Sequence, residues 1–135
     1  MQKIEHIGIA VENLEEANAL FTKLLGTAHY KVEKVEGEKV ATSFFQIGDA
    51  KIELLEATAE NSAIHKFIQK KGKGVHHIAF GVENIYEEME RLKEEGFELL
   101  NEVPKEGADN KLVCFLHPKT TGGVLVEICQ EKKNG

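Results

Sequence analysis

The sequence lacks several features that would point to particular classes of protein. It has no tryptophan, only two cysteines, and no apolar run near the ~20 residues that a membrane helix requires. A disulfide-stapled secreted domain is therefore not indicated, and neither is a membrane protein. Cys114 and Cys129 lie in apolar, strand-like runs, so we expect free thiols in a reducing, cytoplasmic setting.

Basic residues are also too few for a nucleic-acid-binding protein. Lysine and arginine total 17 against 23 acidic residues, which gives a net charge of −6. Such a chain repels a phosphate backbone, whereas an anionic small molecule needs only a local cluster of lysines. With 30% charged and 41% hydrophobic residues, the 135 residues suffice for one globular domain with a single core.

What the sequence does contain is an internal repeat. The stretch "IEHIGIAVENL" at residues 4–14 returns as "HHIAFGVENI" at residues 76–85, so that His77 aligns with His6. Each copy alternates with period two, as a half-buried strand does, and then continues with apolar residues at helical spacing. Asn13 and Asn84 each precede a glutamate by three residues, which is the pattern of a helix-capping box.

Strand-like runs joined by turns follow each predicted helix, so each half reads as β-α-β-β-β and the predicted fold class is α+β. We expect one pseudo-duplicated domain over residues 1–135. Its parts are a first module at 1–59, a linking helix at 60–73 and a second module at 74–131.

Four polar residues at repeated positions are candidates for a metal site. His6 and His77 each share a strand face with the smallest side chains of their strand, which leaves room above the sheet. Glu53 and Glu127 each stand between apolar residues of a later strand, where a carboxylate is costly to bury unless it is paired or binds a metal. Two imidazoles and two carboxylates suit Co²⁺, Mn²⁺, Ni²⁺, Fe²⁺ or Zn²⁺.

Simpler explanations apply to each of these residues alone. A single histidine in a strand is more often a hydrogen-bonded structural residue, and a single glutamate more often faces solvent. Duplication can also preserve residues for folding rather than for chemistry.

Four phrases resemble a known family: "HIGIAV", "IELLEAT", "KGKGVHHIAF" and "FLHPKTTGGVLVEICQ". Over nearly the whole chain they are similar to the vicinal oxygen chelate, or glyoxalase-like, superfamily, and within it to the methylmalonyl-CoA epimerases. The resemblance implies a curved mixed sheet that forms a cup around one divalent ion, Co²⁺ first with Mn²⁺, Ni²⁺ and Zn²⁺ as alternatives. It implies the ligands His6, Glu53, His77 and Glu127, and a homodimer.

The resemblance also implies a reaction, the interconversion of (2R)- and (2S)-methylmalonyl-CoA by α-proton abstraction through a metal-stabilised enolate. Glu127 would be one of the two groups that move the proton. Some relatives carry a second glutamate where this chain has Thr42, so Glu36, Glu38 or a water would have to act instead.

Contacts to the acyl-CoA substrate are predicted from positive charge and from the "HPK" phrase. Lys111, His117 and Lys119 are the predicted substrate-binding residues, with Lys105 nearby in the sequence. Each lysine taken singly is as well explained as an ordinary surface residue.

Three other functions are compatible with the same fold. Glyoxalase I shares the ligand order, but this chain has "HPKTTGG" where glyoxalases typically carry Asp-Pro-Asp-Gly. Extradiol dioxygenases use only two histidines and one carboxylate. A metal-free small-molecule-binding protein needs no ligand set, and the presence of all four candidates argues against it.

Overall fold

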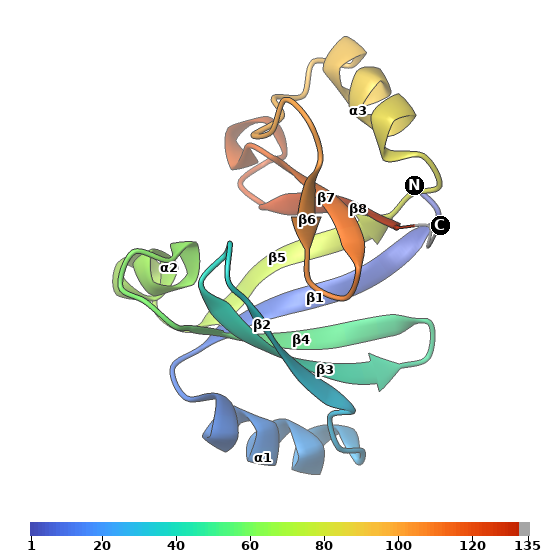
Figure 1. The fold of residues 1–135 in the computed structure, drawn as a ribbon. Coiled ribbons are helices and arrows are strands. Elements are labelled where there is room, and N and C mark those ends of the chain that lie inside the picture. Colours follow the sequence, from blue (N-terminus) through green and yellow to red (C-terminus); the bar gives the residue numbers. More distant parts are fainter. Residues whose placement is uncertain (133–135) are drawn as a thin grey trace. The chain divides into compact units, whose positions relative to one another are not determined.

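The structure, a computed structural model, describes residues 1–132 and divides into two compact units. One unit is His6–His76, and the other combines Met1–Glu5 with the chain from His77 onward. The division falls inside the first strand, β1 (Lys3–Val11), whose first three residues belong to the second of these units (Figure 1). No helix within residues 1–132 is long and apolar enough to cross a membrane.

In the unit His6–His76 the strands follow the order β2 (Lys31–Val35), β3 (Val40–Ile47), β4 (Ala50–Ala57) and β1. Strands β2, β3 and β4 pair antiparallel, and β4 pairs parallel with β1. Its helices are α1 (Leu14–Leu25) and α2 (Ala63–Lys71).

The unit that runs on from His77 repeats this pairing, in the order β5 (Gly74–Gly81), β8 (Val126–Glu131), β7 (Lys111–Leu116) and β6 (Lys105–Gly107). Strand β5 pairs parallel with β8, as β1 does with β4, while β8, β7 and β6 pair antiparallel. The first three residues of β5 belong to the unit His6–His76. The further elements of the unit that runs on from His77 are α3 (Ile85–Glu94) and the 3₁₀ helix η1 (Pro118–Thr120). The predicted β-α-β-β-β pattern is therefore present twice.

Matching caps begin the two repeated helices. The side chain of Asn13 accepts a hydrogen bond from the backbone N–H of Glu16 at 2.9 Å, and that of Asn84 accepts one from Glu87 at 3.1 Å. Each bond satisfies a backbone donor that the first helical turn leaves without a partner. At its other end α1 stops at Gly26, whose φ of 75° is left-handed and therefore favours glycine.

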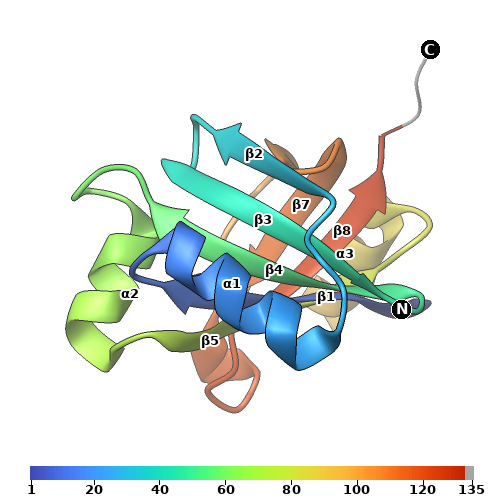
Figure 2. The same cartoon turned by 90° about the horizontal axis from the view of Figure 1, so that it is seen from below.

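Each repeated helix covers one face of its own sheet. Helix α1 lies across β4 and β3 (Figure 2). The buried cluster beneath it consists of Val11, Leu14, Ala41, Phe45 and Leu54. Helix α3 packs on β7 and β8, where Ile85, Met89, Leu116 and Ile128 belong to the corresponding cluster. Each of the larger apolar side chains in these clusters contributes about 1.5–3 kcal/mol on burial. His6 and His77 lie on the opposite faces of the sheets.

Candidate active site

The first candidate pair lies on β1 and β4. Gly8 is the register partner of Glu53, and His6 stands two residues before Gly8 on the same face of the sheet. Because Gly8 has no side chain, the Glu53 carboxylate can extend toward the imidazole. The Nδ1 atom of His6 lies 3.1 Å from Oε2 of Glu53, and each side chain is only 6% exposed.

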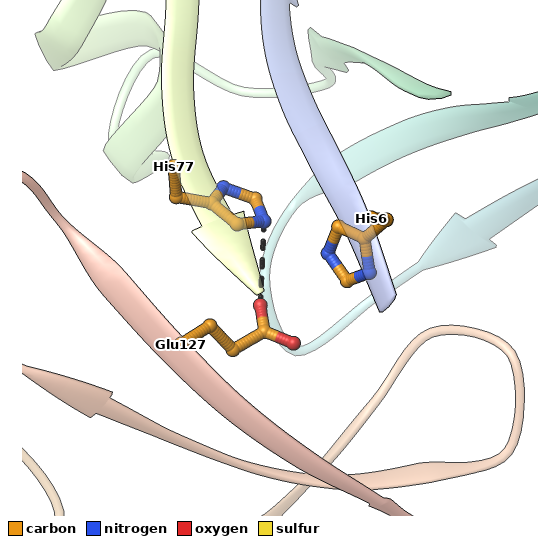
Figure 3. A group of neighbouring side chains, drawn as sticks. All are labelled: His6, His77 and Glu127. Atoms are coloured by element: carbon orange, nitrogen blue, oxygen red, sulfur yellow. Dashed lines mark ion pairs between the residues drawn. The ribbon is translucent and has the colours of Figure 1, made fainter. Parts of the chain in front are cut away.

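The second pair lies at the equivalent place on β5 and β8. Ala79 is the register partner of Glu127, and His77 stands two residues before it. The Nε2 atom of His77 is 3.3 Å from Oε1 of Glu127, with both side chains again buried (Figure 3). The ring of Phe115 meets the His77 imidazole edge-on, with 5.7 Å between centroids, which restricts the imidazole orientation.

The donor atoms of these two pairs suit a divalent metal ion. Each one buries an imidazole nitrogen and a carboxylate oxygen that already approach each other, which offsets the cost of burying the carboxylate. Nitrogen with hard oxygen is a donor set for divalent first-row transition metals, and no thiolate is needed. The structure thus brings the four predicted ligands together in two pairs, one in each unit.

His76, the neighbour of His77, has a different environment. Its ring packs edge-on against Phe67, with centroids 4.9 Å apart. Burial disfavours the charged imidazolium and lowers the pKa of His76 to about 4. His76 is therefore a neutral packing residue within the unit His6–His76, which agrees with the choice of His77 as the candidate ligand.

Lys111 is buried rather than at the surface. Its ammonium group lies 3.9 Å from Oε2 of Glu5, 3.5 Å from Oδ2 of Asp109 and 3.7 Å from Oε1 of Glu131. It lines a cavity of about 470 Å³ together with Glu5 and Lys132. Its charge is thus already matched within its own unit.

His117 and Lys119 lie at the other end of β7. Nδ1 of His117 accepts a hydrogen bond from the backbone N–H of Lys119 at 3.1 Å and so caps η1. The exposed Lys119 ammonium is 2.9 Å from Oε1 of Glu98, and this hydrogen bond lowers the pKa of the Glu98 carboxyl. The length of β7 separates Lys111 from His117 by roughly 20 Å at about 3.3 Å per residue, so the three predicted substrate residues do not form one cluster.

The burial of two further polar residues, Glu5 and Thr42, was not predicted from the sequence. Strict alternation along β1 predicts that Glu5 faces away from His6, yet Glu5 is 3% exposed and pairs with Lys111. Thr42 is 1% exposed, and its hydroxyl has no hydrogen-bond partner among residues 1–132. Nothing in the spacing of residues announces either burial.

Comparison with known proteins fits these observations. Residues 5–115 match the family described as the glyoxalase/bleomycin resistance protein/dioxygenase superfamily. The chain is 40% identical to the mitochondrial methylmalonyl-CoA epimerase of Homo sapiens over 129 residues, which cover 95% of this chain and 73% of the relative. It is 39% identical to an ethylmalonyl-CoA/methylmalonyl-CoA epimerase of Cereibacter sphaeroides over 130 residues, which cover 95% and 97%.

A solved structure extends the similarity to the fold. A methylmalonyl-CoA epimerase of Streptomyces coelicolor, in complex with 2-nitronate-propionyl-CoA, superposes with a TM-score of 0.94 at 32% identity, covering 97% of this chain and 95% of that one. The predicted fold class and family resemblance are both confirmed. The chain belongs to the glyoxalase/bleomycin resistance protein/dioxygenase superfamily and, within it, to the methylmalonyl-CoA epimerase family.

Proposed function

We propose that this chain is a metal-dependent epimerase that interconverts (2R)- and (2S)-methylmalonyl-CoA. The observation that carries the proposal is the buried His–Glu pair repeated at equivalent positions in a chain of this family. A structural role would explain one such pair. It would not explain why both copies keep the same two residue types, both buried and both beside the smallest residues of their strands.

In this proposal His6, Glu53, His77 and Glu127 together hold one divalent ion. Co²⁺ is the first candidate, with Mn²⁺, Ni²⁺ and Zn²⁺ as alternatives. When bound, the ion supplies positive charge where the thioester oxygen becomes negative as the α-proton leaves.

Glu127 also moves the α-proton at one face of the substrate. Proton transfer needs a group within hydrogen-bond reach of the α-carbon and with access to both protonation states. His77, 3.3 Å from Glu127, holds the carboxylate in place, and Phe115 in turn restricts His77.

The acyl-CoA is expected to meet Lys111, His117 and Lys119. The exposed Lys119 can exchange its surface contact with Glu98 for a phosphate at little cost, because exposed ion pairs are worth about 0–1 kcal/mol. Lys111 can contribute only where the substrate reaches its cavity. The proposal includes a homodimer and a reducing, cytoplasmic setting. Cys114 and Cys129 are buried and form no disulfide, which fits a reducing setting.

The reaction is tested by incubating the Co²⁺-loaded protein with a single methylmalonyl-CoA epimer in D₂O. Inversion with incorporation of deuterium at the α-carbon is expected, and it should stop after stripping with EDTA and return on reloading. Conversion of a methylglyoxal hemithioacetal in place of this exchange would move the chain to the glyoxalases. Silence with both substrates and no bound metal would support a metal-free binding protein.

A further inference from the structure

Within residues 6–76, strand register places one other carboxylate on the face of the sheet that carries His6 and Glu53. Register places Phe44 of β3 opposite Glu53, and Thr42 two residues further along on the same face. On the next strand, Glu33 is the register partner of Thr42. Among residues 6–76, Glu33 is the one additional carboxylate that strand register puts on this face.

Side-chain contacts agree with this placement of Glu33. The Lys31 ammonium lies 4.7 Å from the centroid of the Phe44 ring and 3.5 Å from Oε1 of Glu33. The Glu33 carboxylate thus lies beside the Lys31 ammonium, which contacts the ring of Phe44, the register partner of Glu53. The Glu33 side chain is 36% exposed, so it can exchange protons with water.

The hydroxyl between these carboxylates is a second, independent sign of a ligand. Thr42 is buried at 1% exposure, and its Oγ1 atom has no hydrogen-bond partner in the described chain. An unpaired buried hydroxyl costs about 1–3 kcal/mol, a cost that a bound polar group removes. Thr42 itself is a poor proton-transfer group at neutral pH, but its hydroxyl can position a substrate oxygen or a water.

Geometry favours Glu33 over the other carboxylates considered for this role. Glu36 and Glu38 lie in the turn between β2 and β3, beyond the pair Val35 and Val40 that ends the ladder. Two strand spacings across and two residues along separate the Cα atoms of Glu33 and Glu53 by about 12 Å in a flat sheet. A separation of this size leaves room for a small substrate group above the sheet.

We propose that Glu33 is the second proton-transfer group of this epimerase and serves the substrate face that Glu127 does not, while the Thr42 hydroxyl positions the substrate. The assignment rests on the proposed function. In one direction the Glu127 carboxylate removes the α-proton, and the electrons of the C–H bond move into the thioester to form the enolate. Protonated Glu33 then donates its proton to the opposite face of the α-carbon. The reverse direction exchanges the two roles, and water restores both protonation states.

The test follows each epimer separately in D₂O with the Glu33→Gln protein. We expect inversion to fall by about 100-fold or more, the usual contribution of a positioned acid or base. The epimer served by Glu127 should still take up deuterium with retention of configuration, while the other epimer should stop exchanging. Metal content and melting temperature should match the wild type, which a disrupted fold would not allow.

Two further variants control this result. Glu36→Gln removes an exposed carboxylate from the adjoining turn and should leave inversion and exchange unchanged. Adding Thr42→Glu to the Glu33→Gln protein restores a carboxylate to the same face and should recover part of the inversion rate.

Three outcomes would overturn the assignment. Inversion by Glu33→Gln at the wild-type rate would exclude Glu33 as a proton-transfer group. Equal loss of exchange from both epimers, with less bound metal, would show that Glu33 is structural. A wild-type protein that exchanges neither epimer would refute the proposed function, and the assignment would fall with it.

Discussion

The two modules carry the same His–Glu pair but differ in the residues around it. In the first, Phe44 stands opposite Glu53, and in the second Phe115 stands opposite Glu127. A lysine lies over each ring, Lys31 at 4.7 Å from the centroid of Phe44 and Lys105 at 5.6 Å from that of Phe115. Both modules thus share a candidate ligand pair, a phenylalanine opposite its glutamate and a lysine over that ring.

The differences begin one step further along the strands. The first module has the hydroxyl of Thr42 opposite the carboxylate of Glu33. At the equivalent register the second module has apolar Val113 opposite the ammonium of Lys105. The duplication thus keeps the candidate ligands at matching positions, whereas the residues around them differ. Such asymmetry suits a substrate that must meet a proton-transfer group on one side and positive charge on the other.

The largest effect is expected at Glu127, which we propose as both a metal ligand and a proton-transfer group. Glu127→Gln removes a proton-transfer group and weakens a candidate metal ligand while nearly preserving shape, so we expect kcat for epimerisation to fall at least 10³-fold, within the usual range of about 10²–10⁴. Deuterium exchange measured from each epimer checks this. A variant that retains a tenth of wild-type turnover would contradict the role of Glu127.

Substitution of Glu53, the matching glutamate of the first module, should mainly weaken metal binding. Glu53→Ala removes the partner of His6 and one oxygen donor, so metal retention on dialysis should fall markedly. Because Glu53 has no proton-transfer role in this account, activity should return at saturating Co²⁺. Metal analysis together with activity titrated against Co²⁺ distinguishes the two glutamates, and identical behaviour would argue against their different roles.

A smaller effect is expected where the modules differ in charge. Lys105→Met removes the cation over Phe115 and should raise KM for the acyl-CoA by roughly 2- to 5-fold, since an ion pair near the surface is worth about 0–1 kcal/mol. We expect kcat to change little. A fall in kcat at unchanged KM would show that Lys105 acts on the reaction and not on binding.

The smallest effects are expected at the helix caps, where the modules are alike. Asn13→Ala and Asn84→Ala each remove one N-cap hydrogen bond and should each lower the free energy of unfolding by about 1 kcal/mol. Urea unfolding should show similar losses with no change in kcat. A loss of activity in either variant would mean that its helix positions the site.

Much of the architecture follows from local rules that the sequence displays. The capping boxes at Asn13 and Asn84 fix the helix starts, and period-two alternation assigns the faces of His6 and His77. The duplication then identifies the two His–Glu pairs, because histidine and glutamate each recur at matching positions of the two halves. These rules predicted both modules and brought each histidine together with its glutamate.

Contacts between residues of different strands could not be predicted, because they depend on which strands become neighbours. Alternation states which face Glu33 occupies but not that Thr42 lies beside it, because that register depends on the turn at Glu36–Lys39, where Lys39 adopts a left-handed φ of 55°. The burial of Lys111 also needs three carboxylates from separate parts of the chain, Glu5, Asp109 and Glu131. No spacing rule connects residues that are brought together only by tertiary structure.

The central claim is that both modules complete one metal site. It is tested most directly by the stoichiometry of Co²⁺ bound to the stripped wild-type protein and to His6→Ala and His77→Ala, measured by calorimetry and by metal analysis. We expect one ion per chain in the wild type, with either substitution abolishing tight binding. Two ions per chain, or tight binding that survives one of the two substitutions, would contradict it.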